Sequence, residues 1–216
     1  MKDFGLFVAN GKKIIGVAAN YKSLLKSMNK PIPKVPEIFL KPTTSYVTEK
    51  SPIKIPKGFS VNEEVELGVI IGLKAKGVNE DEALNYVGGY CLAFDMTATC
   101  KMKEARSTGG SWTLGKGFDT ATPVSKFIPK SQIPDPHNIT IWCTVNKILR
   151  QNACTVDLVF DIPFLISYVS QFITLEPNDL ILTGSPPGMG PVRNEDVING
   201  GIKGLMEMEF KVVSED

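Results

Sequence analysis

The sequence predicts a mainly β, α+β fold in a single domain that spans residues 1–216. Glycine and proline are frequent, with 19 and 15 copies, and the apolar runs between them are short. This pattern is typical of strands joined by turns. No repeat, low-complexity stretch or linker divides the chain, which is long enough to bury a hydrophobic core.

Several segments have the length and composition of strands. In chain order they cover residues 13–17, 39–41, 64–71, 90–94, 139–145, 180–182 and 205–213. The last of them largely alternates apolar and charged residues, as a strand with one buried face does. Residues 80–87, with a candidate N-cap at Asn79, and residues 162–172, with an apolar face, favour helices. Residues 20–36 predict a short amphipathic helical turn followed by prolines, which is either a mobile lid or a plain connection.

Composition and charge exclude several classes of partner. Hydrophobic residues make up 43% of the chain and charged residues 22%, as in ordinary globular proteins. The net charge of +1 gives no field that would attract nucleic acid or a membrane surface. No apolar run reaches the roughly 18 residues that span a bilayer, and no signal-peptide pattern is present. We therefore expect an intracellular protein with no nucleic-acid and no membrane partner.

The cysteines and the histidine argue against two common kinds of site. None of the four cysteines forms a C-x-x-C pair, and with one histidine this disfavours a zinc site. We expect four reduced, mostly buried thiols. His137 follows Pro134 and Pro136 in a rigid turn and is interpreted as solvated, which excludes Ser-His-Asp and Cys-His catalysis.

Two acidic residues share one face of the predicted strand 64–71. Because strand side chains alternate, Glu64 and Glu66 point one way, and Val65, Leu67 and Val69 point the other. Like charges on one face repel unless a cation or base neutralises them, and hard cations prefer carboxylate oxygens. The alternative is a solvated polar face on an edge strand. When this motif is considered alone, the solvated face is the preferred interpretation.

Asp95 makes the cation site the favoured interpretation of this acidic face. It ends the apolar run 90–94, where an unpaired buried carboxylate would be costly. Considered alone, Asp95 is also compatible with a turn or with an N-cap of a following helix.

Residues 110–117 match most of the G-x-x-x-x-G-K-[ST] pattern of a phosphate-binding loop, but they depart from it at the last position. Gly117 replaces the hydroxyl residue that holds the metal of a nucleotide, and Trp112 and Leu114 crowd the loop. Nucleotide binding is therefore disfavoured. Lys116 lies between two glycines, and it either points into a site, where it would stabilise an enolate or carry a proton, or lies on a surface hairpin.

A glycine-rich segment, residues 182–191, follows a short predicted strand. No helix follows it, so a dinucleotide-binding fold is not predicted. The hydroxyl groups of Thr183 and Ser185, with free backbone N–H groups, suit a substrate carboxylate, although a tight turn explains the segment equally well.

Taken in order, these segments resemble the fumarylacetoacetate hydrolase family, in particular its acylpyruvase and oxaloacetate decarboxylase branch. The matching segments are residues 20–21, 39–42, 64–68, 86–90, 95–98, 112–119, 133–137, 166–170 and 182–186. The resemblance runs from about residue 12 to residue 213. It implies the distorted β-roll of the family's C-terminal domain.

The resemblance also implies a site and a chemistry. It places Mg²⁺ or Mn²⁺ on Glu64, Glu66 and Asp95, and the active-site lysine on Lys116. The expected substrate-binding residues are Asn20, Tyr21, Thr183, Gly184 and Ser185. Members of the family cleave or decarboxylate β-dicarbonyl 2-oxo acids, usually as dimers, and this branch occurs in mitochondria and the cytosol.

Several positions depart from the family pattern. Leu24 and Ser27 stand where the family has the histidine and glutamate that activate water. Further departures from the usual charged and polar residues are Ala18, Ala19, Asn62, Glu63, Thr99, Cys100 and Met102. Loss of the water-activating pair should reduce hydrolysis by roughly 10²–10⁴-fold. Decarboxylation needs no activated water, and enol–keto tautomerisation needs only a metal and one proton carrier.

Three interpretations follow. The first is an enzyme with oxaloacetate decarboxylase or acylpyruvase activity, which the retained carboxylates and Lys116 favour. The second is an oxaloacetate tautomerase with a reduced site. The third is a pseudoenzyme that keeps the fold and acts as a binding or dimer partner, which the clustered departures favour.

Overall fold

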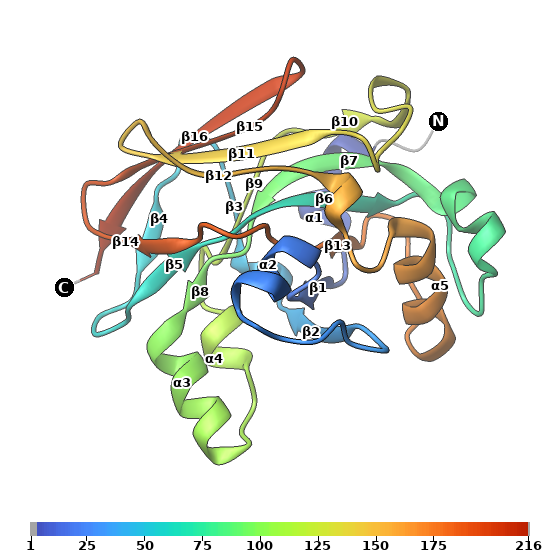
Figure 1. Cartoon of the computed structure of the whole chain (residues 1–216). Coiled ribbons are helices and arrows are strands. Elements are labelled where there is room, and N and C mark those ends of the chain that lie inside the picture. Colours follow the sequence, from blue (N-terminus) through green and yellow to red (C-terminus); the bar gives the residue numbers. More distant parts are fainter. Residues whose placement is uncertain (1–3, 216) are drawn as a thin grey trace.

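A computed structural model describes residues 4–215 and contains three sheets (Figure 1). The largest has eight strands in the order β2-β1-β13-β6-β7-β9-β3, with β10 also on β7. Its strands are β1 (Ile14–Ala18), β2 (Glu37–Lys41), β3 (Tyr46–Thr48), β6 (Val65–Ile71), β7 (Val87–Phe94), β9 (Thr122–Val124), β10 (Ile128–Pro129) and β13 (Leu180–Leu182). The mainly β, α+β class is confirmed.

The two smaller sheets carry the remaining strands. The five-stranded sheet has the order β12-β11-β15-β16-β4. Its strands are β4 (Ile53–Ile55), β11 (Thr140–Val145), β12 (Ile148–Cys154), β15 (Val197–Ile202) and β16 (Met206–Ser214). The three-stranded sheet is formed by β14 (Gly190–Val192), β5 (Val61–Glu63) and β8 (Thr97–Ala98).

Short helices connect the strands. The α-helices are α1 (Phe7–Asn10), α2 (Lys22–Ser27), α3 (Thr99–Thr108), α4 (Thr113–Lys116) and α5 (Ile162–Phe172). The 3₁₀ helices are η1 (Phe4–Leu6), η2 (Thr43–Ser45), η3 (Glu80–Tyr86), η4 (Lys130–Gln132) and η5 (Thr155–Asp157). Figure 1 shows α3 and α4 projecting together from one end of the sheets. None of the helices among residues 4–215 is long and apolar enough to cross a membrane.

Strand β6 lies between β13 and β7 and is buried on both faces. Val65, Leu67 and Val69 belong to the main core, which also includes residues of the five-stranded sheet. Ile70, on the other face, packs in a second cluster with Leu180. The interpretation of β6 as a solvated edge strand is therefore wrong, and Glu66 lies inside the protein.

All the predicted strands are present, with ends that shift by a few residues, and the helix predicted over residues 162–172 is α5. Asp161 caps this helix, because its carboxylate accepts a hydrogen bond from the Phe164 amide at 2.9 Å. The amphipathic turn predicted within residues 20–36 is α2. Residues 80–86 instead form a 3₁₀ helix without a side-chain cap from Asn79. The three-residue period places Ala83 and Tyr86 together against the core.

His137 is less solvated than the sequence predicted. Its side chain is 29% exposed, and the amide of Ile162, the first residue of α5, donates a hydrogen bond to its Nε2 atom at 3.3 Å. This hydrogen bond ties the turn that carries His137 to the start of α5, which is a structural role. The four cysteines are free, as expected, but only Cys91 and Cys143 are fully buried.

Candidate metal centre and substrate pocket

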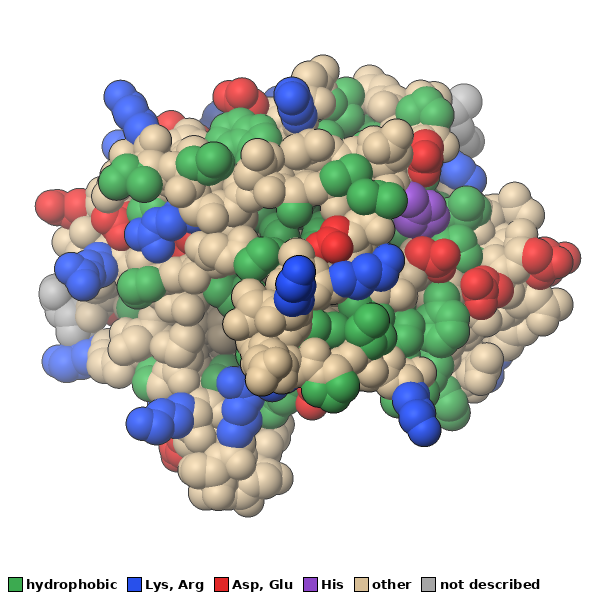
Figure 2. All heavy atoms as spheres, in the orientation of Figure 1, with side chains coloured by type: hydrophobic (Ala, Val, Ile, Leu, Met, Phe, Trp, Pro, Cys, Tyr) green, Lys and Arg blue, Asp and Glu red, His purple; other side chains and the backbone are tan. Residues whose placement is uncertain are grey.

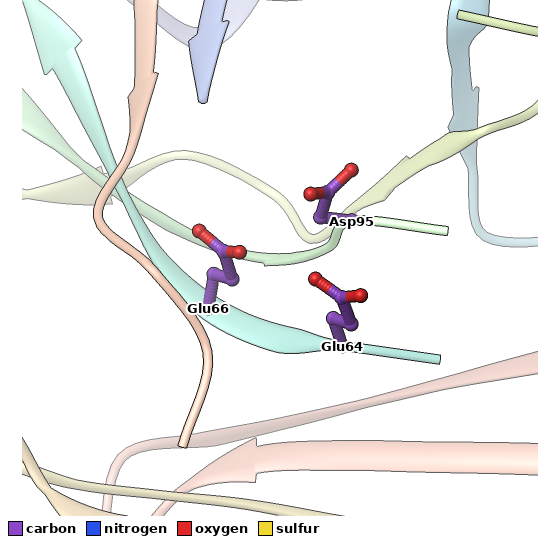
Figure 3. A group of neighbouring side chains, drawn as sticks. All are labelled: Glu64, Glu66 and Asp95. Carbon is purple, nitrogen blue, oxygen red and sulfur yellow. The ribbon is translucent and has the colours of Figure 1, made fainter. Parts of the chain in front are cut away.

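Three carboxylates converge where β6 and β7 run side by side. In this antiparallel pair Glu66 is opposite Ala93, and the Asp95 amide donates to the Glu64 carbonyl at 2.8 Å. Glu64 and Glu66 project from one side of their strand towards Asp95 (Figure 3). One oxygen from each carboxylate lies within 4.8 Å of the others. The structure thus brings together the three residues that the sequence singled out.

Lys116 lies against this cluster. Its Nζ atom donates to Asp95 Oδ2 at 2.5 Å, to Thr97 Oγ1 at 2.6 Å and to Glu64 Oε2 at 3.2 Å. The side chain is only 7% exposed, so the interpretation as a surface hairpin lysine is wrong. Asp95 is equally buried, and the N-cap position of α3 is Ala98, so Asp95 is not a helix cap.

A second ammonium group, that of Lys41, was missed by the sequence analysis. Its Nζ atom donates to Asp95 Oδ1 at 2.5 Å and to the Ala121 carbonyl at 2.8 Å. The side chain is completely buried. A signal was present, because Lys41 ends a predicted strand and lies within a segment that matches the family. A lysine at such a position requires a buried acid as its partner.

The charges in the cluster are unequally compensated. Burial raises the pKa of Asp95, but the ammonium groups of Lys116 and Lys41 outweigh burial, and the net direction is downward. Burial, and then the charges of Asp95 and Glu64, raise the pKa of Glu66 well above its usual value. The Glu66 carboxylate accepts a hydrogen bond from a backbone amide, that of Gly184, at 2.6 Å from Oε2.

These residues fit a divalent cation. Three carboxylates face two ammonium groups, so negative charge is in excess in the cluster. The carboxylate without an ion pair among these is that of Glu66. Each carboxylate oxygen that accepts one hydrogen bond keeps a further lone pair. Oxygen donors of this kind suit Mg²⁺, Mn²⁺ and Ca²⁺. The chemistry of the donor set therefore agrees with the metal site predicted from the sequence.

The carboxylates and Lys116 open into a pocket with a volume of 630 Å³. On one side the pocket is lined by Leu24 of α2 and by Met28, the residue after this helix, and the Ser27 hydroxyl donates to the Leu24 carbonyl at 2.7 Å. On another side Phe39 and Trp112 form a wall, with ring centroids 5.8 Å apart. The surface that α2 presents to the metal cluster is therefore apolar.

The predicted substrate-binding residues divide into two groups. Ser185 lines the pocket, and Gln151, a second residue missed from the sequence, donates to its hydroxyl at 2.7 Å. Gln151 also accepts from the Val65 amide at 2.8 Å, so it ties Ser185 to β6. The others, Asn20, Tyr21, Thr183 and Gly184, are buried.

The buried group supports the pocket wall. The Asn20 amide group donates to the Thr183 carbonyl at 2.8 Å and to the Phe160 carbonyl at 2.9 Å. The Thr183 hydroxyl donates to the Leu67 carbonyl at 2.9 Å. Gly184 has a φ of +101°, and a Cβ atom there would lie 2.6 Å from the Asn20 Cβ. Only glycine allows this approach, which aims the Gly184 amide at Glu66.

Next to the cluster lies Glu63, whose side chain is fully buried. Its Oε2 atom accepts from the Gly190 amide at 3.1 Å, and burial raises its pKa to about 7. For an acid, a raised folded-state pKa means that stability is greatest below the unfolded-state value and falls as the pH rises through about 7.

We therefore expect the Glu63→Gln variant to flatten the pH dependence of stability. Between pH 4.5 and pH 8.5 the wild type should lose about 3 kcal/mol more unfolding free energy than the variant. Urea unfolding of both proteins with EDTA across this range measures the difference, because all other titrating groups are shared. Parallel pH profiles would contradict the assignment.

Comparisons with known proteins define the class to which this fold and this site belong. The model of the fumarylacetoacetate (FAA) hydrolase C-terminal domain matches residues 13–213, and the chain belongs to the fumarylacetoacetate hydrolase family. The family expected from the sequence is therefore confirmed.

Two relatives with named activities and one solved structure are similar to this chain over nearly its whole length. The chain is 47% identical over 203 residues to mitochondrial oxaloacetate tautomerase FAHD1 of Homo sapiens, covering 94% of this chain and 92% of the relative. It is 43% identical over 210 residues to mitochondrial oxaloacetate decarboxylase of Dictyostelium discoideum, covering 96% of each. Fumarylpyruvate hydrolase from Pseudomonas aeruginosa, solved with Mn²⁺ and pyruvate, superimposes with a TM-score of 0.90 at 29% identity, covering 95% of this chain and 91% of that one.

Proposed function

We propose that this protein is a divalent-metal-dependent enzyme that enolises small β-dicarbonyl 2-oxo acids such as oxaloacetate. Decarboxylation and enol–keto tautomerisation both pass through an enolate, which forms by loss of CO₂ in the first and by loss of a proton in the second. The observation that carries the proposal is the Lys116 ammonium group, which contacts both Asp95 and Glu64 at the edge of one pocket. The named activities of the relatives from Homo sapiens and Dictyostelium discoideum agree with it.

In this proposal Glu64, Glu66 and Asp95 hold Mg²⁺ or Mn²⁺. The bound cation would supply Lewis-acid polarisation of the 2-oxo acid. Lys116 carries positive charge and N–H donors at the position where the enolate oxygen develops, and it exchanges the proton. Ser185, held by Gln151, orients the substrate carboxylate, and the apolar side chains of α2 keep water away from the reacting carbon.

The same geometry disfavours hydrolysis. Leu24 presents an apolar side chain to the pocket, and Ser27 uses its hydroxyl on the backbone of α2. Neither side chain can act as a base towards water. Cleavage of acylpyruvates by water should therefore be slow in this protein, while proton transfer remains efficient.

Restoring a basic pair on α2 is expected to restore hydrolysis. The Leu24→His/Ser27→Glu variant should hydrolyse acetylpyruvate at least about tenfold faster than the wild type, since general base catalysis contributes 10²–10⁴-fold when well placed. Release of pyruvate from acetylpyruvate with Mn²⁺ measures this. The Leu24→Asn/Ser27→Gln variant is the matched control, being polar but without a base. Equal rates in both variants would contradict the proposed role of these positions.

Oxaloacetate turnover with Mn²⁺ tests the function directly. Enol absorbance and pyruvate formation should be followed in the same sample. Loss of the enol signal without pyruvate is expected from a tautomerase, and pyruvate formation from a decarboxylase; either outcome supports the proposal. If neither signal appears while Mn²⁺ still stabilises the fold, the protein is a pseudoenzyme that binds a partner.

We extend the proposal to the cellular location and the oligomeric state of the enzyme. The relatives are named as mitochondrial, which supports a mitochondrial location over a cytosolic one. Residues 1–216 would act as a single domain, and the family resemblance supports a homodimer. Sedimentation of the purified protein distinguishes a dimer of the 23.6 kDa chain from a monomer.

A further inference from the structure

The pocket-facing side of α3 carries two cations that the mechanism above does not use. Thr99, Met102, Lys103 and Arg106 recur at helical spacing and line the same pocket as the carboxylate cluster. The basic side chains of α3 appear as a blue group over this helix (Figure 2). Thr99 and Met102, at the start of this stripe, are the positions where the family resemblance led us to expect an arginine and a glutamine.

Among residues 4–215, neither Lys103 nor Arg106 has an ion-pair partner. The nearby Glu104 is paired with Lys101 at 3.0 Å instead. The pocket lining contains Lys30 as a further cation and Glu37 as its one acid outside the metal cluster. The end of the pocket away from the carboxylates is therefore net positive, and it can bind an anion without first breaking a salt bridge.

Arg106 is held on the same wall as Lys116. Its guanidinium carbon lies 5.6 Å from the centre of the Trp112 ring. Trp112 packs on Phe39, and the Lys116 Nζ atom lies 4.8 Å from the centre of the Phe39 ring. Two aromatic rings thus separate the two cations. A ligand that runs along this wall meets a positive group at each end and apolar surface between them.

The direction and length of α3 set the spacing. The helix starts four residues after Asp95, and with a rise of 1.5 Å per residue Lys103 lies about 6 Å and Arg106 about 10 Å beyond Thr99. Helical side chains lean towards the N-terminus, so both cations reach back towards the metal cluster. The distance suits a molecule longer than a four-carbon acid, as does a pocket of 630 Å³.

We propose that Lys103 and Arg106 bind a second, distal carboxylate of the substrate, so that the site prefers extended dicarboxylic 2-oxo acids. The 2-oxo acid end binds at the carboxylate cluster, the carbon chain lies on Met102 and the aromatic wall, and the distal carboxylate meets the two cations. This inference rests on the proposed function, because it assumes that the cluster end receives a 2-oxo acid. It makes Lys103 and Arg106 specificity-determining residues.

Calorimetric binding of two acids of equal length to the Mn²⁺-loaded protein tests the inference without requiring turnover. The acids are 2-oxoadipate, with a distal carboxylate, and 2-oxohexanoate, with a methyl group in its place. We expect 2-oxoadipate to bind at least about tenfold more tightly, as a charge-assisted hydrogen bond at a partly exposed site provides. The preference should weaken with added salt.

Variants assign the preference to α3. In Lys103→Gln/Arg106→Gln the tenfold difference should disappear while 2-oxohexanoate binds as before. Arg106→Lys should keep part of the difference, and the control Lys101→Gln, on the same helix, should keep all of it. Equal binding of both acids to the wild type, or a difference that survives in the double variant, would overturn the inference and leave the proposed function intact. Failure of both acids to bind would also overturn the inference, whereas the proposed function is tested separately by the oxaloacetate turnover described above.

Discussion

The Lys116→Met variant is expected to lose at least about 100-fold in the rate of oxaloacetate enolisation while it still binds Mn²⁺. The side chain keeps its approximate length and its apolar stem, so the change removes the ammonium group and little else. That group donates to Asp95 and Glu64 at the edge of the pocket and faces the developing enolate in the proposed mechanism. Among residues 4–215, Lys116 is the one lysine that forms an ion pair with Glu64.

Two measurements separate this effect from a loss of structure or of metal. The Mn²⁺-dependent rise in melting temperature should persist in Lys116→Met, because the three carboxylates remain. The Lys101→Met variant, which removes an exposed lysine paired with Glu104, serves as a control and should turn over like the wild type. Wild-type turnover in Lys116→Met would show that another group moves the proton.

The Asp95→Asn variant is expected to lose about 3–5 kcal/mol of unfolding free energy even when EDTA removes all metal. Asp95 accepts from two buried ammonium groups, those of Lys41 and Lys116, at 2.5 Å each. An asparagine leaves the buried Lys41 without a counter-ion and leaves Lys116 with Glu64 alone. Urea unfolding with EDTA measures this loss apart from any contribution of the metal.

Glu66→Gln is the matched control, since Glu66 belongs to the same cluster but its carboxylate is not ion-paired in residues 4–215. In EDTA this variant should be as stable as the wild type or more stable, because it removes an uncompensated buried charge. With Mn²⁺ at about 100 times its dissociation constant, the wild type should gain about 2.7 kcal/mol and Glu66→Gln should gain almost nothing. A full metal response in Glu66→Gln would show that the cluster does not bind the cation.

The parts of the fold that the sequence predicted are those with a strong local pattern. β16 alternates charged and apolar residues, and α5 has an apolar stripe at helical spacing, so both were found. α3 was missed because only Met102 and Ala105 of its ten residues are buried, which leaves almost no periodic signal. β8 was also missed, because a strand of two residues has no pattern of its own and depends on a partner distant in sequence.

In the candidate site, too, the residues with a local sequence pattern were predicted and those that depend on distant contacts were not. The alternation of Glu64 and Glu66, with Asp95 at a strand end, indicated a cation site, and the family resemblance gave these three residues as its ligands. Lys41 and Gln151 were not found, because their importance lies in contacts with Asp95 and Ser185 that are 54 and 34 residues away in sequence. Such contacts follow from the order of strands in the sheet, which a single sequence does not reveal.

The projecting position of α3 has a consequence for how this enzyme can diversify. The carboxylates lie at the junction of two core strands, whereas most side chains of α3 lie outside the core. Exchanges on the exposed face of α3 therefore leave the metal ligands and their supporting bonds in place. In our proposals the carboxylate cluster carries the reaction chemistry and α3 the substrate choice, so the pocket-facing residues of this helix are the natural target for redesigning selectivity by directed evolution, with the catalytic core held constant.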